Sequence, residues 1–173
     1  MQGVVTMPQD ILYKTDHTVF SYRAAGILVK DGAVLLQKPT NDPGHAFPGG
    51  HVTFGETAEE TLVREFREEM GAEIEVGGLR WVGEIFIPVG SRRMHQLCLY
   101  YDVHLRDPAS IPTTGSFQGT ESMEGKSFRM GFHWIPIEAL DHILVYPPET
   151  IGFLKENDPQ VKTFQYYEED EVT

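Results

Sequence analysis

The sequence predicts an α+β fold, in which strands along the whole chain surround one well-marked helix. Three observations carry this prediction. A hairpin turn signal, Asp31-Gly32, separates two apolar runs near the start of the chain. Start and stop signals of a helix enclose residues 58–70. Apolar and polar residues then alternate over residues 94–105, which is the period of a half-buried strand.

Length and composition favour one globular domain. At 173 residues the chain is long enough for one well-buried hydrophobic core but too short for two stable ones. Its 40% hydrophobic and 23% charged residues are ordinary globular values, which argues against wholesale disorder. We therefore expect a single domain over residues 1–173 with a core of about residues 19–156, preceded by a loose N-terminus and followed by a loose acidic tail.

Composition also disfavours several classes of function. No apolar run is long enough to span a membrane, and residues 1–14 lack the pattern of a secretory signal, so we expect a cytoplasmic protein with no membrane partner. Cys98 is the only cysteine, which excludes an internal disulfide and a thiolate zinc site. The net charge of −12 disfavours binding to nucleic acid. A small anionic substrate would nearly require a bound cation to reverse the local charge.

The first third of the chain predicts strands and a loop. Residues 18–30 are rich in β-branched and aromatic residues, and residues 33–36 form an apolar run across the turn, so together they predict two paired strands. Residues 41–50 carry Asn, Asp, Pro and Gly in quick succession and predict a loop. Residues 51–54 are a candidate short strand.

The helix has the clearest boundaries in the sequence. Thr57 is suited to the N-cap, and Glu60 three residues later completes a capping box. Gly71 stands where a helix should stop, because glycine readily adopts the left-handed conformation of a helix C-cap. One helix over about residues 58–70 follows.

Two long strands and a long loop are predicted after the helix. Residues 79–89 and 94–105 read as strands joined across residues 90–93. Residues 107–127 hold Pro, Gly, Ser and Thr without periodicity and predict a loop of about 20 residues. Such a length is unusual inside a compact domain and is typical of a substrate loop or a disordered one.

The C-terminal part predicts shorter elements. Residues 128–135 predict a further strand, and residues 136–140 the start of a short helix with proline in its first turn. Residues 149–155 are expected to form a last short helix. The aromatic segment 164–167 leaves two interpretations open, namely packing across a homodimer or an apolar patch on a loose tail.

Three carboxylates are predicted to share one face of the helix. Glu65, Glu68 and Glu69 are spaced i, i+3 and i+4, while Leu62 and Phe66 begin a neighbouring apolar stripe. Oxygen ligands of this kind suit Mg²⁺, Mn²⁺ or Ca²⁺, and a cation would relieve their mutual repulsion. The same acidic face is also typical of a solvated helix whose Arg64 pairs with Glu68, so it does not establish a metal site.

The joint spacing of the glycines and charged residues is far more specific. The chain shows the order G-x5-E-x7-R-E-U-x-E-E-x-G-U, formed by Gly50, Glu56, Arg64, Glu65, Glu68, Glu69 and Gly71, with Phe66 and Ala72 at the apolar places. This pattern resembles the Nudix box and matches it at every fixed position. Residues 23–36, 47–50 and 132–140 resemble other parts of Nudix domains. The resemblance implies a Nudix-type α/β/α sandwich with a mixed central sheet.

The resemblance also implies roles for individual residues. Glu65, Glu68 and Glu69 would bind Mg²⁺ or Mn²⁺, with the backbone carbonyl of Gly49 as a further ligand. Arg64 would hold Glu56 and orient the cluster. The base that activates water would be a box glutamate, with Glu65 or Glu68 ahead of Glu69. Its rivals are Glu121 and Glu124 in the predicted long loop, which are at least as readily explained as solvated loop acids.

The implied function is metal-dependent hydrolysis of a phosphoanhydride bond. The substrate would be a nucleoside diphosphate linked to another moiety, or a nucleoside triphosphate. One alternative is a catalytically silent Nudix module that senses a nucleotide or binds a partner, although such domains tend to lose acidic box residues. Another is a pyrophosphohydrolase of a non-nucleotide diphosphate, such as an isoprenoid or pterin compound. The expected partner is therefore a small-molecule diphosphate, and a homodimer is possible.

Overall fold

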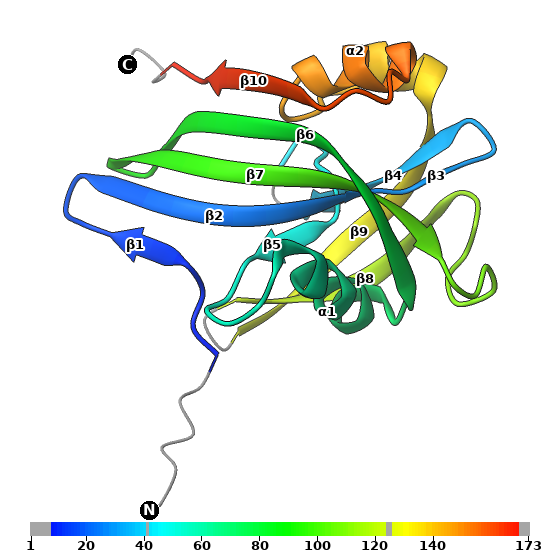
Figure 1. Ribbon diagram of the computed structural model, residues 1–173, viewed down its shortest axis with the longest axis horizontal. Helices are drawn as coiled ribbons and strands as arrows, with labels where there is room; N and C mark the ends of the chain where they lie inside the picture. Colours follow the sequence, from blue (N-terminus) through cyan, green and yellow to red (C-terminus); the bar gives the residue numbers. More distant parts are fainter. Residues whose placement is uncertain (1–7, 41, 124–125, 170–173) are drawn as a thin grey trace, which may run out of the picture.

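Two β-sheets make up most of the structure, a computed structural model that describes residues 8–40, 42–123 and 126–169 (Figure 1). The larger sheet contains β1 (Leu12–Lys14), β2 (Thr18–Ile27), β7 (Arg92–Leu105), β6 (Ile74–Val89) and β10 (Lys162–Tyr167) in that order, and β5 (Gly49–His51) pairs with β2. The smaller sheet has the order β3 (Val29–Lys30), β4 (Ala33–Pro39), β9 (Lys126–Pro136) and β8 (Ser116–Met123). The helical elements are α1 (Ala58–Met70), the 3₁₀ helix η1 (Ile137–His142) and α2 (Glu149–Glu156).

Helices lie on both sides of the larger sheet, as the predicted sandwich requires. In Figure 1, α1 lies below the strands and α2 above them, next to β10. The sheet is mixed, because β2 runs parallel to β7 and β6 runs parallel to β10, while the other pairs are antiparallel. The predicted α+β class with a mixed sheet is confirmed. Within the described ranges, no helix is long and apolar enough to cross a membrane.

The predicted N-terminal hairpin is only partly right. Asp31 and Gly32 do form the turn, with φ of 51° and 76°. However, residues 18–30 do not form one strand that pairs with the next. The segment divides at the buried Leu28, so that β2 pairs with β7 in the larger sheet and only the short β3 pairs with β4. Sequence propensity shows that a segment is extended but not which sheet it joins.

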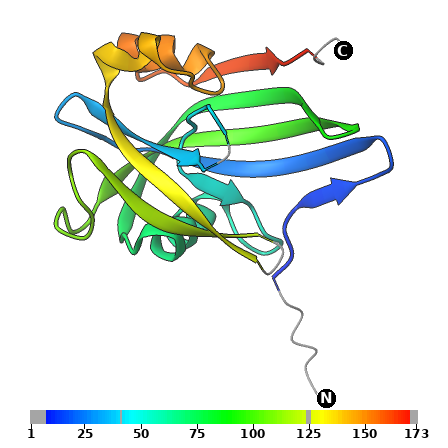
Figure 2. The same ribbon diagram turned by 180° about the vertical axis from the view of Figure 1, so that it is seen from behind.

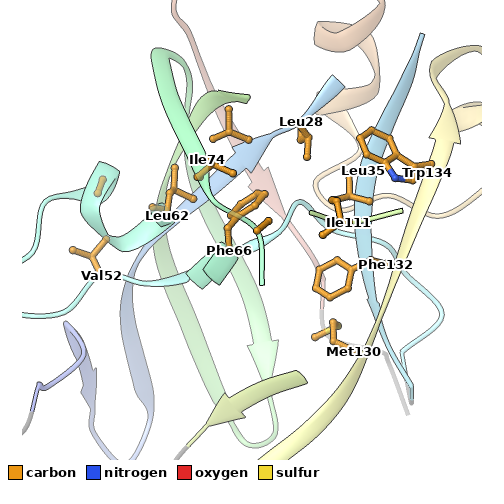
Figure 3. Packing of buried hydrophobic residues seen from close by; sticks show 14 residues of the cluster. Leu28, Leu35, Val52, Leu62, Phe66, Ile74, Ile111, Met130, Phe132 and Trp134 are labelled. Carbon is orange, nitrogen blue, oxygen red and sulfur yellow. The ribbon is translucent and has the colours of Figure 1, made fainter. Parts of the chain in front are cut away.

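Two hydrophobic clusters pack on either side of the larger sheet. The first lies against α1 and includes Leu62 and Phe66 of the helix together with Phe132 of β9 (Figure 3). Gly26 of β2 permits this close packing, because a Cβ atom there would lie 2.8 Å from the Phe66 ring. The second cluster lies against α2 and η1 and includes Trp81, Tyr100, Leu140, Leu154 and Phe164. The helix that carries the carboxylates is thus anchored through its apolar stripe.

The predicted long loop over residues 107–127 is wrong in its second half. Residues 116–123 form β8, which pairs with β9 so that Phe117 faces Phe132 across the ladder. Gly119 lies against α1, where a Cβ atom would overlap the carbonyl oxygen of Glu69. A strand that passes so close to a helix needs small residues, which removes the apolar alternation that identifies most strands. The backbone of Glu121 lies in β8, while its side chain and all of Glu124 lie outside the described residues.

The C-terminal aromatic segment is a strand rather than a patch on a loose tail. Residues 162–167 form β10, which pairs in parallel with β6. Phe164 is buried in the cluster under α2, so the core extends beyond the expected limit of residue 156. A partner strand about 80 residues earlier in the chain leaves no local sequence signal. The N-terminal part that was expected to be loose includes β1, which pairs with β2, whereas residues 1–7 and residues 170–173 of the expected acidic tail lie outside the described residues.

Candidate metal and catalytic site

The carboxylate-bearing helix begins and ends where the sequence predicts. The Thr57 hydroxyl accepts a hydrogen bond from the Glu60 backbone N–H at 3.1 Å, and the Glu60 carboxylate accepts one from the Thr57 N–H at 2.8 Å. This reciprocal capping box satisfies two backbone donors at the helix start. Gly71 ends the helix in the left-handed conformation, with a φ of 70°. The spacing of the box residues is therefore fixed on one continuous helix.

Arg64 holds Glu56 in the way the sequence predicts. Its Nε donates to Glu56 Oε1 at 2.9 Å, and its Nη2 donates to Glu56 Oε2 at 3.1 Å. Thr61 adds a hydroxyl hydrogen bond to Glu56 Oε2 at 2.9 Å. Arg64 Nη2 also donates to the carbonyl oxygen of His51 in β5, at 3.3 Å. The guanidinium thus ties the helix to the segment that precedes it and fixes Glu56 beside it.

The same guanidinium brings two of the three predicted metal ligands together. Arg64 Nη1 donates to Glu65 Oε1 at 2.7 Å and to Glu68 Oε2 at 3.2 Å. Glu69 lies deeper in the fold than Glu65 and Glu68. It is only 4% exposed and shares the buried side of α1 with Leu62 and Phe66. The three glutamates therefore differ in solvent exposure: Glu68 is exposed, Glu65 is half-buried and Glu69 is buried.

The glycine pair of β5 lies directly against this group. A Cβ atom on Gly50 would overlap the carboxylate of Glu65, and one on Gly49 would overlap the carbonyl oxygen of Ala24 in β2. The carbonyl oxygen of Gly49, the further predicted ligand, accepts a hydrogen bond from Arg23 Nη2 at 3.2 Å. Both positions need glycine because another group lies very close to the Cα atom: the Glu65 carboxylate at Gly50 and the Ala24 backbone at Gly49.

The pKa values of Glu65 and Glu56, the two half-buried glutamates beside Arg64, are shifted in opposite directions. Burial raises the pKa of the Glu65 carboxyl, and the charge and hydrogen bond of Arg64 lower it by less, so the pKa stays above its ordinary value. Burial also raises the pKa of Glu56, but the hydrogen bonds from Arg64 and Thr61 outweigh burial and hold that pKa below its ordinary value. Glu56 is therefore firmly ionised, whereas Glu65 accepts a proton more readily.

A cleft of about 570 Å³ lies beside the glycine pair. Its lining includes Arg23, Phe47, Tyr100, Tyr146 and Tyr166. Arg23 joins the cleft to the box, because it lines the cleft and also donates to the Gly49 carbonyl. Sequence reasoning missed Arg23. A single arginine at the start of an apolar run, Arg23-Ala24-Ala25-Gly26-Ile27, was the available signal.

The comparison with protein families agrees with this geometry. The model of the NUDIX domain matches residues 21–161, which is most of the chain. The chain belongs to the NUDIX family. The predicted family membership is therefore confirmed, and the Nudix box is the segment from Gly50 to Ala72 on β5 and α1.

Individual Nudix relatives are similar over different extents. An ADP-ribose pyrophosphatase of Methanocaldococcus jannaschii is 51% identical over 49 residues, which is 27% of this chain and 29% of that protein. Among solved structures, a mutator MutT protein from Bacillus halodurans has a TM-score of 0.54 at 19% identity, covering 85% of this chain and 90% of that one. A MutT NUDIX hydrolase from Burkholderia pseudomallei has a TM-score of 0.54 at 20% identity, covering 80% and 98%. The two structures support the fold alone.

The ligand atoms of this Nudix box are of the type that a hard divalent cation prefers, although the side chains are not already arranged around an ion. Over residues 8–40, 42–123 and 126–169, no three or more His, Cys, Asp or Glu residues are already placed to hold an ion. The donors nevertheless consist of carboxylate and carbonyl oxygens, which suit Mg²⁺ or Mn²⁺. Glu65 and Glu68 already share one cationic partner, the Arg64 guanidinium, and Gly50 leaves the space that the Glu65 carboxylate uses.

Proposed function

We propose that the protein is a divalent-metal-dependent pyrophosphohydrolase. It would cleave a phosphoanhydride bond in a nucleoside diphosphate linked to another moiety, or in a nucleoside triphosphate. The observation that carries this proposal is the convergence of Glu56, Glu65 and Glu68 on Arg64, next to the glycine pair and the cleft. A diphosphate repels nucleophiles because its oxygens are anionic, so a hydrolase needs a cation to neutralise that charge, and these carboxylates would hold it.

Each box residue has a distinct part in the proposed reaction. Glu65, Glu68, Glu69 and the Gly49 carbonyl would hold Mg²⁺ or Mn²⁺. When bound, such an ion would neutralise charge on the diphosphate and acidify the attacking water. Arg64 and Glu56 would position these ligands through their bidentate pair. Arg23, between the cleft and the glycine pair, would contact a phosphate oxygen.

The base would be Glu65. Water attacks one phosphorus atom, the bridging P–O bond breaks, and a carboxylate takes the proton of the water. The Glu65 carboxylate lies against the backbone at Gly50 and accepts a hydrogen bond from Arg64, which gives it a fixed position from which to take that proton. Glu68 is the second choice. Glu121 and Glu124 remain rival proposals for this role.

Two observations support the proposed substrate class, namely the aromatic residues of the cleft and the similarity to one relative. The half-buried aromatic side chains Tyr146 and Tyr166 line a cleft large enough for a nucleoside, and aromatic rings suit the flat face of a base. ADP-ribose, the compound named for the archaeal relative, is a nucleoside diphosphate linked to a sugar. We therefore place ADP-ribose first among the candidate substrates.

A substrate panel tests the proposed function. The full chain is assayed with ADP-ribose, other nucleoside diphosphate derivatives, nucleoside triphosphates and an isoprenoid diphosphate, each with Mg²⁺, with Mn²⁺ and with EDTA. We expect at least one nucleotide to be cut at its diphosphate, with activity abolished by EDTA and restored by excess metal. Products are identified by mass spectrometry.

The other outcomes of the panel are equally informative. No turnover of any compound with either metal would overturn the proposed function. Calorimetric binding of a nucleotide without product would favour a silent Nudix module. Turnover of the isoprenoid compound alone would replace the nucleotide by a non-nucleotide diphosphate.

A further inference from the structure

A second polar hollow lies on the smaller sheet, outside the Nudix box. It has a volume of about 440 Å³, and its lining includes Lys38, Thr40, Gln118, Arg129 and His133. These residues come from the end of β4 and from β8 and β9, two paired strands that cross the front of the view in Figure 2. The hollow is therefore built on paired strands and not on a single exposed loop.

Strand register places the polar side chains on one face. Lys38 and Gln118 both lie opposite Gly131, in one row across the three strands. Arg129 and His133 are two residues before and after Gly131 on β9, so all these side chains point to the same side. Gly131 forms the floor, because a Cβ atom there would lie 2.9 Å from His133 Nε2. A larger residue at position 131 would fill the hollow.

The hollow carries uncompensated positive charge. Among the described residues, neither Lys38 nor Arg129 forms an ion pair, whereas Arg64, Arg67, Arg80, Lys155 and Lys162 all do. The described residues that line the hollow include no Asp or Glu, so the two cations lie together without a carboxylate in the lining. Guanidinium and ammonium groups at one hollow provide the hydrogen-bond donors that a phosphate group requires.

His133 adds a fixed polar group to this wall. Its Nδ1 lies 2.7 Å from the Ser116 hydroxyl, which holds the ring in place. Burial and the neighbouring Lys38 and His45 lower its pKa, so the ring is neutral at pH 7 and supplies a hydrogen bond rather than a charge. The positive charge of the hollow therefore comes from Lys38 and Arg129.

The hollow adjoins the cleft beside the box. Pro39 lines both of them. His133 of the hollow and His45 of the cleft have ring centroids 5.5 Å apart. The cleft also includes Arg23, which contacts the Gly49 carbonyl. The hollow and the cleft are therefore neighbours on the surface, so a ligand in the cleft would have Lys38 and Arg129 beside it.

We propose that this hollow is a second anion subsite, which binds a phosphate monoester on the substrate away from the diphosphate that is cut. The proposal rests on the proposed function, because it assumes that the box acts on a diphosphate bound at the cleft. It narrows the substrate class to nucleoside diphosphate derivatives that carry an additional phosphate, for example on a ribose hydroxyl. Lys38 and Arg129 would be the residues that determine this specificity.

Matched substrates test the proposal. ADP-ribose and ADP-ribose 2′-phosphate differ only in one phosphate, as do dephospho-coenzyme A and coenzyme A. We expect the wild-type protein to prefer the phosphorylated member of at least one pair by about tenfold or more in kcat/KM. The Lys38→Gln and Arg129→Gln variants should each reduce that preference through KM, and the double variant should abolish it. Activity on the unphosphorylated member should stay within about twofold.

A matched control removes a cation elsewhere. Lys30 pairs with Asp31 at the β3–β4 turn, so Lys30→Gln makes the same charge change outside the hollow. This variant should keep the full preference. If it loses the preference as the hollow variants do, net charge and not the hollow determines the selectivity, and the proposal is wrong.

A binding measurement separates this proposal from the proposed function. Calorimetry without metal compares adenosine 2′,5′-bisphosphate and adenosine 3′,5′-bisphosphate with AMP. Tighter binding of a bisphosphate that disappears in the double variant would support the hollow even if no diphosphate is hydrolysed. Equal binding and equal turnover of both members of every pair would overturn the hollow while leaving the proposed function intact. Inorganic phosphate that binds at Lys38 and Arg129 without discriminating the substrates would also overturn it, since the site would then serve a free anion.

Discussion

The Glu68→Gln variant is expected to lose at least about 100-fold in kcat while its thermal unfolding midpoint stays unchanged. The Glu68 side chain is 58% exposed, and among the described residues its one ion pair is with the Arg64 guanidinium, at 3.2 Å. An exposed pair of this spacing contributes only about 0.5 kcal/mol to stability, so the fold does not depend on it. Its loss removes a carboxylate charge from the proposed metal site. The measurements are kcat at saturating metal and a circular dichroism melt.

Glu59 provides a matched control on the same helix. It is exposed in the first turn of α1, and Glu59→Gln removes the same charge away from Arg64. This variant should keep kcat within about twofold. If Glu68→Gln retains wild-type kcat, Glu68 is not a ligand. If Glu68→Gln unfolds, the residue has a structural role that its exposure does not indicate.

The Gly50→Ala variant is expected to lose about 100-fold in activity with little loss of stability. The added Cβ atom would overlap the carboxylate of Glu65, which is the far end of a flexible side chain and can move aside. The fold then survives, but Glu65 leaves its place beside Arg64. Steady-state kinetics and a denaturant titration separate these two effects.

Gly49→Ala is the contrasting substitution one residue earlier. Its Cβ atom would overlap the carbonyl oxygen of Ala24 in the neighbouring strand β2, and backbone cannot move aside. We expect a loss of about 1–3 kcal/mol in the free energy of unfolding. Equal destabilisation by both substitutions would mean that Gly50 serves only the backbone, and the proposed link between Gly50 and Glu65 would be wrong.

The position of α1 was predictable because its signals are local. Thr57, Glu60 and Gly71 act within one turn of their own positions, so the sequence alone determines where α1 begins and ends. The Arg64–Glu56 pair was expected only from the resemblance to the Nudix box, because Glu56 precedes the helix and helical spacing alone pairs Arg64 with Glu68. The burial of Glu69 was also accessible, since it lies three and seven residues after Phe66 and Leu62 and so shares their side of the helix.

The two missed strands have different causes. β10 pairs with β6, about 80 residues earlier in the chain, so no local window of sequence shows its partner. β8 pairs with β9, which follows it directly in the chain, but its sequence lacks the apolar alternation that identifies most strands. The cleft, like β10, depends on distant segments, because Arg23, Phe47, Tyr100, Tyr146 and Tyr166 meet only in the folded chain. Substrate specificity therefore could not be read from the box, which the whole family shares.

Binding of Mn²⁺ tests the role of the α1 carboxylates most directly. Free Mn²⁺ is measured by electron paramagnetic resonance as the wild-type protein and its Glu65→Gln and Glu68→Gln variants are titrated, with Glu59→Gln as the control. We expect the wild type and the control to bind Mn²⁺ with the same affinity, and both box variants to bind it at least about tenfold more weakly. Equal affinity in all four proteins would contradict the assignment of the metal site to this helix.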